Sequence, residues 1–79
     1  MNRLLRFLGP ALRYMRQQRG LRQVDLADRA RITKGMLSAY ERRRRLPSLR
    51  TLSRLLDALD ARLLDLGRVV EEVEAARRR

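Results

Sequence analysis

The chain has 79 residues, the length of one small domain. It contains no cysteine and no histidine, which excludes a disulfide framework, a thiol nucleophile, an imidazole base and a cysteine or histidine zinc site. The net charge of +11 favours a polyanionic partner, and residues 1–45 carry most of it, with thirteen Lys and Arg against three acidic residues.

Residues 1–9 are predicted to be an N-terminal extension in which arginines alternate with apolar residues. Three interpretations remain open. The segment packs on the domain or a second subunit and buries Leu4, Leu5 and Phe7. Alternatively, its arginines enter a minor groove, or it lies on a membrane surface. It is too short for a secretory signal and has no cleavage site.

The first helix is expected to begin at Pro10, because proline is favoured in the first helical turn. It should run to about Arg19, and Gly20 should end it as the residue after the C-cap. Gly9-Pro10 is therefore predicted to be a boundary, with a domain over residues 10–62.

Two short helices joined by a tight turn are predicted next, over Gln23–Ala30 and about 34–42. Thr33 is a suitable N-cap for the second of them. Viewed along that helix, an apolar side and a side of small residues with an arginine face in opposite directions. The apolar side consists of Met36, Leu37 and Tyr40, and the other side of Gly35, Ser38 and Arg42.

Four consecutive arginines, Arg42 to Arg45, follow this helix. In an arbitrary protein such a run is usually a solvated charged segment. Here it leaves a helix whose small outer side chains suit close approach to a nucleic acid, so contact with phosphates is the preferred interpretation.

A fourth helix is predicted after the N-cap Ser48, with a buried stripe of Leu52, Leu55, Leu56 and Leu59. The same spacing continues into residues 63–79, a predicted C-terminal helix with a basic tail. That helix either completes the monomer core or contacts a second subunit, and dimerisation is preferred. The candidate interface residues are Leu63, Leu66, Val69, Val70 and Val73.

The segment from Leu12 to Leu66 resembles the helix-turn-helix domain of the phage-repressor and Cro type, the XRE family. The residues that carry the resemblance are Gln23, Leu26, Ala27, Leu37, Glu41, Pro47 and Ser48. It implies a compact all-α fold of four to five helices, with the C-terminal helix as an addition.

The resemblance also implies roles for individual residues. In this family the second helix of the motif enters the major groove, and the base-contacting candidates are Lys34, Gly35, Ser38 and Ala39. The phosphate-contacting candidates are Gln23, Thr33, Arg42, Arg43, Arg44 and Arg45. Arg16 and Glu41 are expected to form a structural ion pair.

Three positions depart from the family pattern. Arg31 occupies the turn position usually held by glycine, and Arg43 replaces the glycine that commonly follows the Glu-Arg pair. Arg22 stands where serine or threonine normally caps a helix. A left-handed conformation at Arg31 would cost on the order of 1 kcal/mol, so the turn is open to a different construction.

The preferred function is a cytoplasmic, sequence-specific regulator of transcription that binds double-stranded DNA as a homodimer on a two-fold operator. The alternative is a protein-interaction module, such as an antitoxin that wraps a toxin and autoregulates through the same motif. A restriction–modification controller also fits the size. No cofactor, metal or enzymatic activity is expected, because no motif supplies a nucleophile, a base or a cofactor site.

Overall fold

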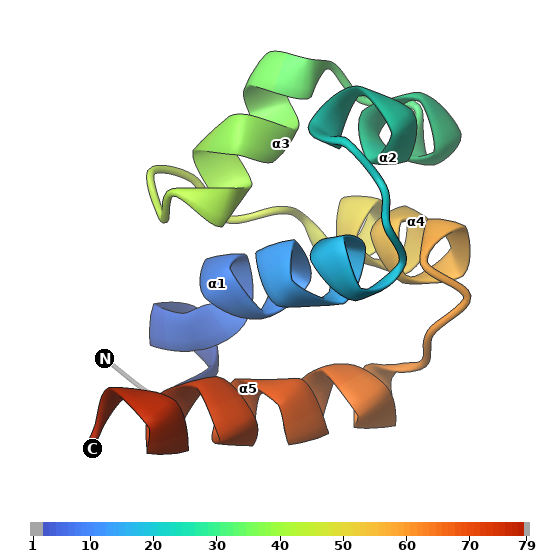
Figure 1. Ribbon diagram of the computed structural model, residues 1–79. Helices are drawn as coiled ribbons and strands as arrows, with labels where there is room; N and C mark the ends of the chain where they lie inside the picture. Colours follow the sequence, from blue (N-terminus) through green and yellow to red (C-terminus); the bar gives the residue numbers. More distant parts are fainter. Residues whose placement is uncertain (1–2, 79) are drawn as a thin grey trace.

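The computed structural model describes residues 3–78 and contains five helices over that range (Figure 1). The helices are α1 (Arg3–Gln18), α2 (Gln23–Ala30), α3 (Lys34–Glu41), α4 (Leu49–Ala58) and α5 (Leu63–Arg77). The predicted all-α fold is confirmed. No helix in this range is long and apolar enough to cross a membrane. Residues 1–2 of the predicted extension and Arg79 of the basic tail lie outside the described residues.

The central helix is α1, which packs against both α3 and α5, while α2 packs against α3 and α4 (Figure 1). Every helix contributes a fully or nearly fully buried leucine or valine to one continuous core. Its largest fully buried side chains are Leu12, Leu26, Leu37, Leu55, Leu59 and Leu66. Each such side chain contributes about 1.5–3 kcal/mol through removal from water. The leucine stripe predicted for α4 is therefore part of this core.

The predicted start of the first helix at Pro10 is wrong, because α1 begins at Arg3 and continues through Pro10. A proline inside a helix removes one backbone hydrogen bond. Tertiary packing outweighs that loss here, since Phe7 and Leu8 on the preceding turn are buried in the core. The expected burial is correct for Phe7 only, because Leu4 and Leu5 are 43% and 38% exposed.

Four helices end in the same way, with a residue of positive φ at or directly after the C-cap and a hydrogen bond that spans six residues. These residues are Gly20, Arg31, Arg43 and Asp60, with φ of 68°, 61°, 64° and 52°. The spanning bonds join Leu21 N to Arg16 O, Ile32 N to Ala27 O, Arg44 N to Ala39 O and Ala61 N to Leu56 O. The prediction for Gly20 is confirmed, and the turn at Arg31 keeps its left-handed form without glycine.

The C-terminal helix corrects the predicted dimer interface. Leu66 and Val70 are 0% and 3% exposed inside the monomer core, because α5 lies along α1. Val69 and Val73 are partly buried against the same core. Leu63 alone of the five candidates is strongly exposed, at 65%. For Leu66 and Val70, α1 of the same chain is therefore the covering partner, and their prediction as dimer-interface residues is wrong.

Candidate nucleic-acid interface

The N-terminus of α3 is fixed by Thr33, whose Oγ1 accepts a hydrogen bond from the backbone N–H of Met36 at 3.0 Å. This is the N-cap that the sequence predicts. Thr33, Lys34 and Gly35 are all exposed. The first turn of α3 therefore presents a cation, a hydroxyl and bare backbone to solvent.

The outer side of α3 is open, as the sequence pattern predicts. Leu37 and Tyr40 are 0% and 4% exposed on the inner side. Gly35 on the other side is exposed, and Ser38 and Ala39 are partly exposed. Because these three side chains are small, the helix backbone can approach a flat or grooved surface closely.

The segment after α3, which we call the arginine loop, consists of Arg42, Arg43, Arg44 and Arg45. All four are exposed. Within the described part of the chain, no side chain of the loop takes part in an ion pair or a hydrogen bond. Arg43 adopts a φ of 64°, which costs a non-glycine residue about 1–2 kcal/mol. The loop therefore keeps a charged side chain at a position where glycine would be more stable.

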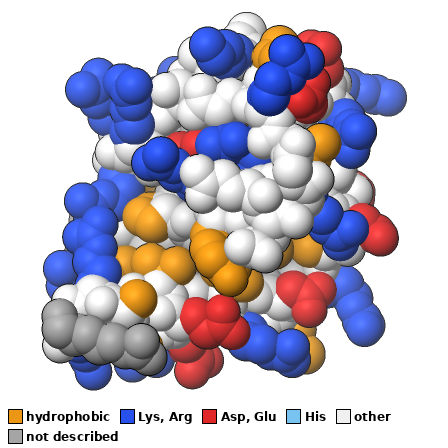
Figure 2. Space-filling view, in the orientation of Figure 1, with side chains coloured by type: hydrophobic (Ala, Val, Ile, Leu, Met, Phe, Trp, Pro, Cys, Tyr) orange, Lys and Arg blue, Asp and Glu red, His pale blue; other side chains and the backbone are white. Residues whose placement is uncertain are grey.

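Basic side chains gather along the left side of the molecule in Figure 2, beside α3 and the segment that follows it. Lys34 adds its charge at the start of the same helix and forms no ion pair with any described residue. The acidic residue closest in sequence to the arginine loop, Glu41, is buried and already paired with Arg16. The positive field of this face is therefore available to an external anion.

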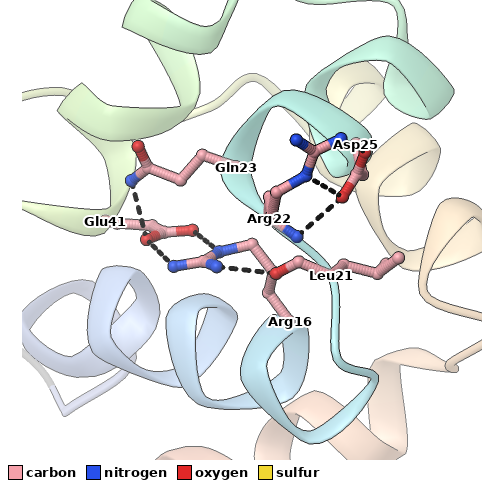
Figure 3. A network of polar contacts seen from close by, with 6 residues as sticks. All are labelled: Arg16, Leu21, Arg22, Gln23, Asp25 and Glu41. Carbon is pink, nitrogen blue, oxygen red and sulfur yellow. Dashed lines mark hydrogen bonds and ion pairs between the residues drawn. The ribbon is translucent and has the colours of Figure 1, made fainter.

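A buried ion pair joins α1 to the end of α3 (Figure 3). The guanidinium of Arg16 donates from Nε to Glu41 Oε2 at 2.7 Å and from Nη2 to Glu41 Oε1 at 3.0 Å. Its Nη1 donates to the carbonyl oxygen of Leu21 at 2.8 Å. This bidentate geometry fixes both distance and orientation, so α3 is held at a defined angle on α1.

The position of Gln23 differs from the expectation of a simple phosphate contact. Its Nε2 donates to Glu41 Oε1 at 3.1 Å, so the side chain belongs to the buried network (Figure 3). An amide nitrogen carries two N–H groups, and this bond uses one of them. The network therefore joins the C-terminal part of α1, the first residue of α2 and the last residue of α3. The sequence contains no pattern from which this bond could be read.

Arg22 begins α2 without a capping side chain, but Asp25 compensates. The Asp25 carboxylate accepts from the backbone N–H of Arg22 at 2.9 Å and from its guanidinium at 3.0 Å. These hydrogen bonds lower the pKa of Asp25 below its ordinary value. An orphan N–H at the helix start is thereby satisfied, and the departure at Arg22 leaves the start of α2 intact.

Comparison with known proteins gives consistent results. A family model described as helix-turn-helix matches residues 12–66. A crystal structure of the clp gene regulator ClgR from Corynebacterium glutamicum is 32% identical, covers 94% of this chain and 79% of that chain, and has a TM-score of 0.85. The wild-type restriction–modification controller protein C.Esp1396I shares the fold, with 19% identity, 91% and 92% coverage and a TM-score of 0.80. No curated protein matches the sequence.

Proposed function

The chain belongs to the helix-turn-helix family of the phage-repressor (XRE) type, whose members are DNA-binding regulators of transcription. From this premise we propose that it recognises a specific DNA operator through α3. The observation that carries the proposal is the open, basic outer side of α3 and the arginine loop, held in place by the buried Arg16–Glu41 pair. We propose that it acts in the cytoplasm.

In this proposal α3 lies in the major groove. Lys34 is the best candidate for a guanine contact, because its ammonium group can donate to O6 or N7. Gly35 and Ala39 offer almost no hydrogen-bonding capacity, so they permit close approach, and Ala39 can contact a thymine methyl group. Ser38 can donate to or accept from a base edge. Direct readout is therefore limited to a few base pairs.

Most of the affinity is assigned to the phosphate contacts. The arginine loop supplies four guanidinium groups, and the Thr33 hydroxyl and the remaining N–H of Gln23 supply neutral donors. Phosphate contacts position a protein on DNA and carry no sequence information directly. The strain accepted at Arg43 supports this role, since local rules of stability are most often broken at functional sites.

Substitution of Lys34 by alanine should relax the preference at one base pair by about 1–3 kcal/mol. Substitution of Arg43 by alanine should instead weaken binding to all sequences alike and reduce the salt dependence by about one phosphate contact. Alanine has the same Cβ atom as arginine and therefore the same cost at positive φ, so Arg43→Ala removes the guanidinium group without relieving the backbone. Footprinting titrations on selected and scrambled duplexes at stated salt concentrations measure both effects. Indifference to both substitutions would place the docking face elsewhere.

A two-fold operator requires a dimer, whose half-sites should lie about 34 Å apart. We propose that two copies meet at a leucine surface formed by Leu49 and Leu63, which are 85% and 65% exposed. Together with the buried Leu52 and Leu56 they line a hollow of about 280 Å³. Exposed apolar side chains that converge over a hollow are typical of protein contact sites.

The double substitution Leu49→Gln and Leu63→Gln should raise the dimer dissociation constant by at least about tenfold, because it removes both apolar groups. Sedimentation equilibrium measures the change. The matched control is Leu46→Gln, an exposed leucine that does not line the hollow. Equal dissociation constants for the double variant and the control would refute the leucine surface.

The antitoxin alternative relies on a terminal apolar segment that wraps a partner. Leu66 and Val70 of α5 and Phe7 of α1 are buried in the monomer core. These side chains are consequently occupied within the chain, and no observation favours that alternative over the DNA-binding proposal.

A further inference from the structure

A groove of about 680 Å³ lies between the first turns of α1 and the segment that follows α3. Its volume falls within the range typical of small-molecule sites. The apolar part of its wall includes Leu8 and Leu46, and Gly9 and Pro47 also line it. In Figure 2, hydrophobic side chains are visible beside the basic left edge of the molecule.

Tyr40, one of the lining residues, carries a hydroxyl without a hydrogen-bond partner among the described residues. The residue lines the groove and is 4% exposed. Within the described part of the chain its hydroxyl forms no hydrogen bond and is not completely enclosed by protein atoms. A buried tyrosine hydroxyl normally finds a partner. Because this hydroxyl has no partner among the described residues, we assign it as a donor to a group that enters the groove.

The rim of the groove is strongly cationic. Five arginines line it, namely Arg6 and the four of the arginine loop, and none of the described lining residues is acidic. Arg6 lies over the ring of Phe7, with its guanidinium carbon 5.3 Å from the ring centroid. An occupant that matches this surface needs an anionic head and an apolar body.

We propose that this groove binds a soluble single-chain amphiphilic anion, with its hydrocarbon chain on the apolar wall and its phosphate or carboxylate head on the arginine loop. Because the same arginines are assigned to DNA phosphates, the bound anion displaces DNA. This regulatory consequence rests on the proposed function, whereas the binding itself does not.

Binding is tested without DNA by calorimetric titration of the full chain with decyl phosphate below its micelle concentration. Decyl phosphate should bind at least about tenfold more tightly than inorganic phosphate, because burial of the alkyl chain adds to the charge interaction. Equal affinities for the two probes would overturn the proposal. Binding to vesicles of anionic phospholipid without binding of monomeric decyl phosphate would overturn it as well.

Three variants localise the site. Tyr40→Phe should weaken decyl phosphate binding by about tenfold, the value of one hydrogen bond to a charged group. Leu46→Gln should weaken it by about fivefold through lost apolar contact. Leu64→Gln, an exposed leucine outside the groove, should leave it unchanged. Equal affinity for all three variants would indicate adsorption of a surfactant to a cationic protein and would overturn the site.

The regulatory step is tested by titration of a selected duplex in the presence of decyl phosphate. The anion should lower the DNA affinity of the wild-type chain at least about tenfold at saturation, and that of Leu46→Gln much less at the same concentration. If decyl phosphate binds while the DNA affinity stays unchanged, the regulatory step is wrong. If the chain binds no duplex but binds decyl phosphate in the groove, the proposed DNA-binding function is wrong and the proposed anion site is supported.

Discussion

Substitution of Glu41 by glutamine should lower the free energy of unfolding by about 3–5 kcal/mol, because it leaves the charge of Arg16 buried without a counterion. The side chains of Arg16 and Glu41 are 10% and 3% exposed. A small domain has a total stability of only about 5–15 kcal/mol. The variant should therefore lose a large part of its stability and melt at a markedly lower temperature than the unchanged chain. Thermal and urea melts followed by circular dichroism measure the change.

The matched control for Glu41→Gln is Glu74→Gln. Glu74 pairs with Arg3 at 2.8 Å and with Arg78 at 3.4 Å, and these two arginine side chains are 56% and 75% exposed. A pair screened by solvent in this way contributes at most about 1 kcal/mol. A loss of less than about 1 kcal/mol for Glu41→Gln as well would show that Arg16 and Glu41 form only a loose pair.

A paired replacement separates the two consequences of this network. Arg16→Met combined with Glu41→Leu removes both charges at once, so most of the lost stability should return. The bidentate geometry that orients α3 on α1, and the anchor of Gln23 on Glu41, are lost in the same variant. The double variant should therefore be folded but should bind its operator with reduced affinity.

The fold was largely predictable because its local signals agree. Thr33 and Ser48 cap the helices that they were predicted to cap, and Gly20 ends the helix before them. Leucine stripes at helical spacing then determine which faces meet in the core. Consistency between caps and stripes is what makes a sequence readable at this level.

The errors arose where tertiary packing decides. Pro10 is a favourable helix start in isolation, yet the helix continues past it because Phe7 and Leu8 gain more by burial than the lost hydrogen bond costs. Leu66 and Val70 form an apolar face whose partner the pattern does not specify. Whether such a face meets its own chain or another copy depends on where α1 lies.

The candidate site shows the same division. The exposed side of α3 follows from the helical period, so the placement of Gly35 and Ser38 was predictable. The left-handed backbone at Arg31 and Arg43 was indicated only by the glycines that the family has at these positions, because arginine itself gives no local signal for positive φ. The bond from Gln23 to Glu41 joins residues that only the assembled fold brings together.

The sequence pattern places Gly9 at a domain boundary, but in the structure Gly9 lies where α1 closely approaches α3. A Cβ atom at this position would lie 2.1 Å from the carbonyl oxygen of Tyr40 and 3.1 Å from that of Glu41. Both oxygens belong to the backbone at the end of α3, so neither can rotate away. Arg16 lies two turns further along the same face of α1 and holds Glu41 in place. Close approach of α1 to α3 therefore requires glycine here.

Substitution of Gly9 by alanine should lower the free energy of unfolding by about 2–3 kcal/mol, the net of overpacking against α3 and the gain in helix propensity. The control is Gly67→Ala in α5, where the added Cβ would have no neighbour within 4 Å apart from the adjoining backbone of its own helix. That variant should gain about 0.5–1 kcal/mol. Because both changes add the same methyl group inside a helix, urea melts of the two variants isolate the cost of the α1–α3 contact. Equal stabilisation of both variants would show that α1 and α3 can separate freely, and the fixed angle of α3 would then have no support.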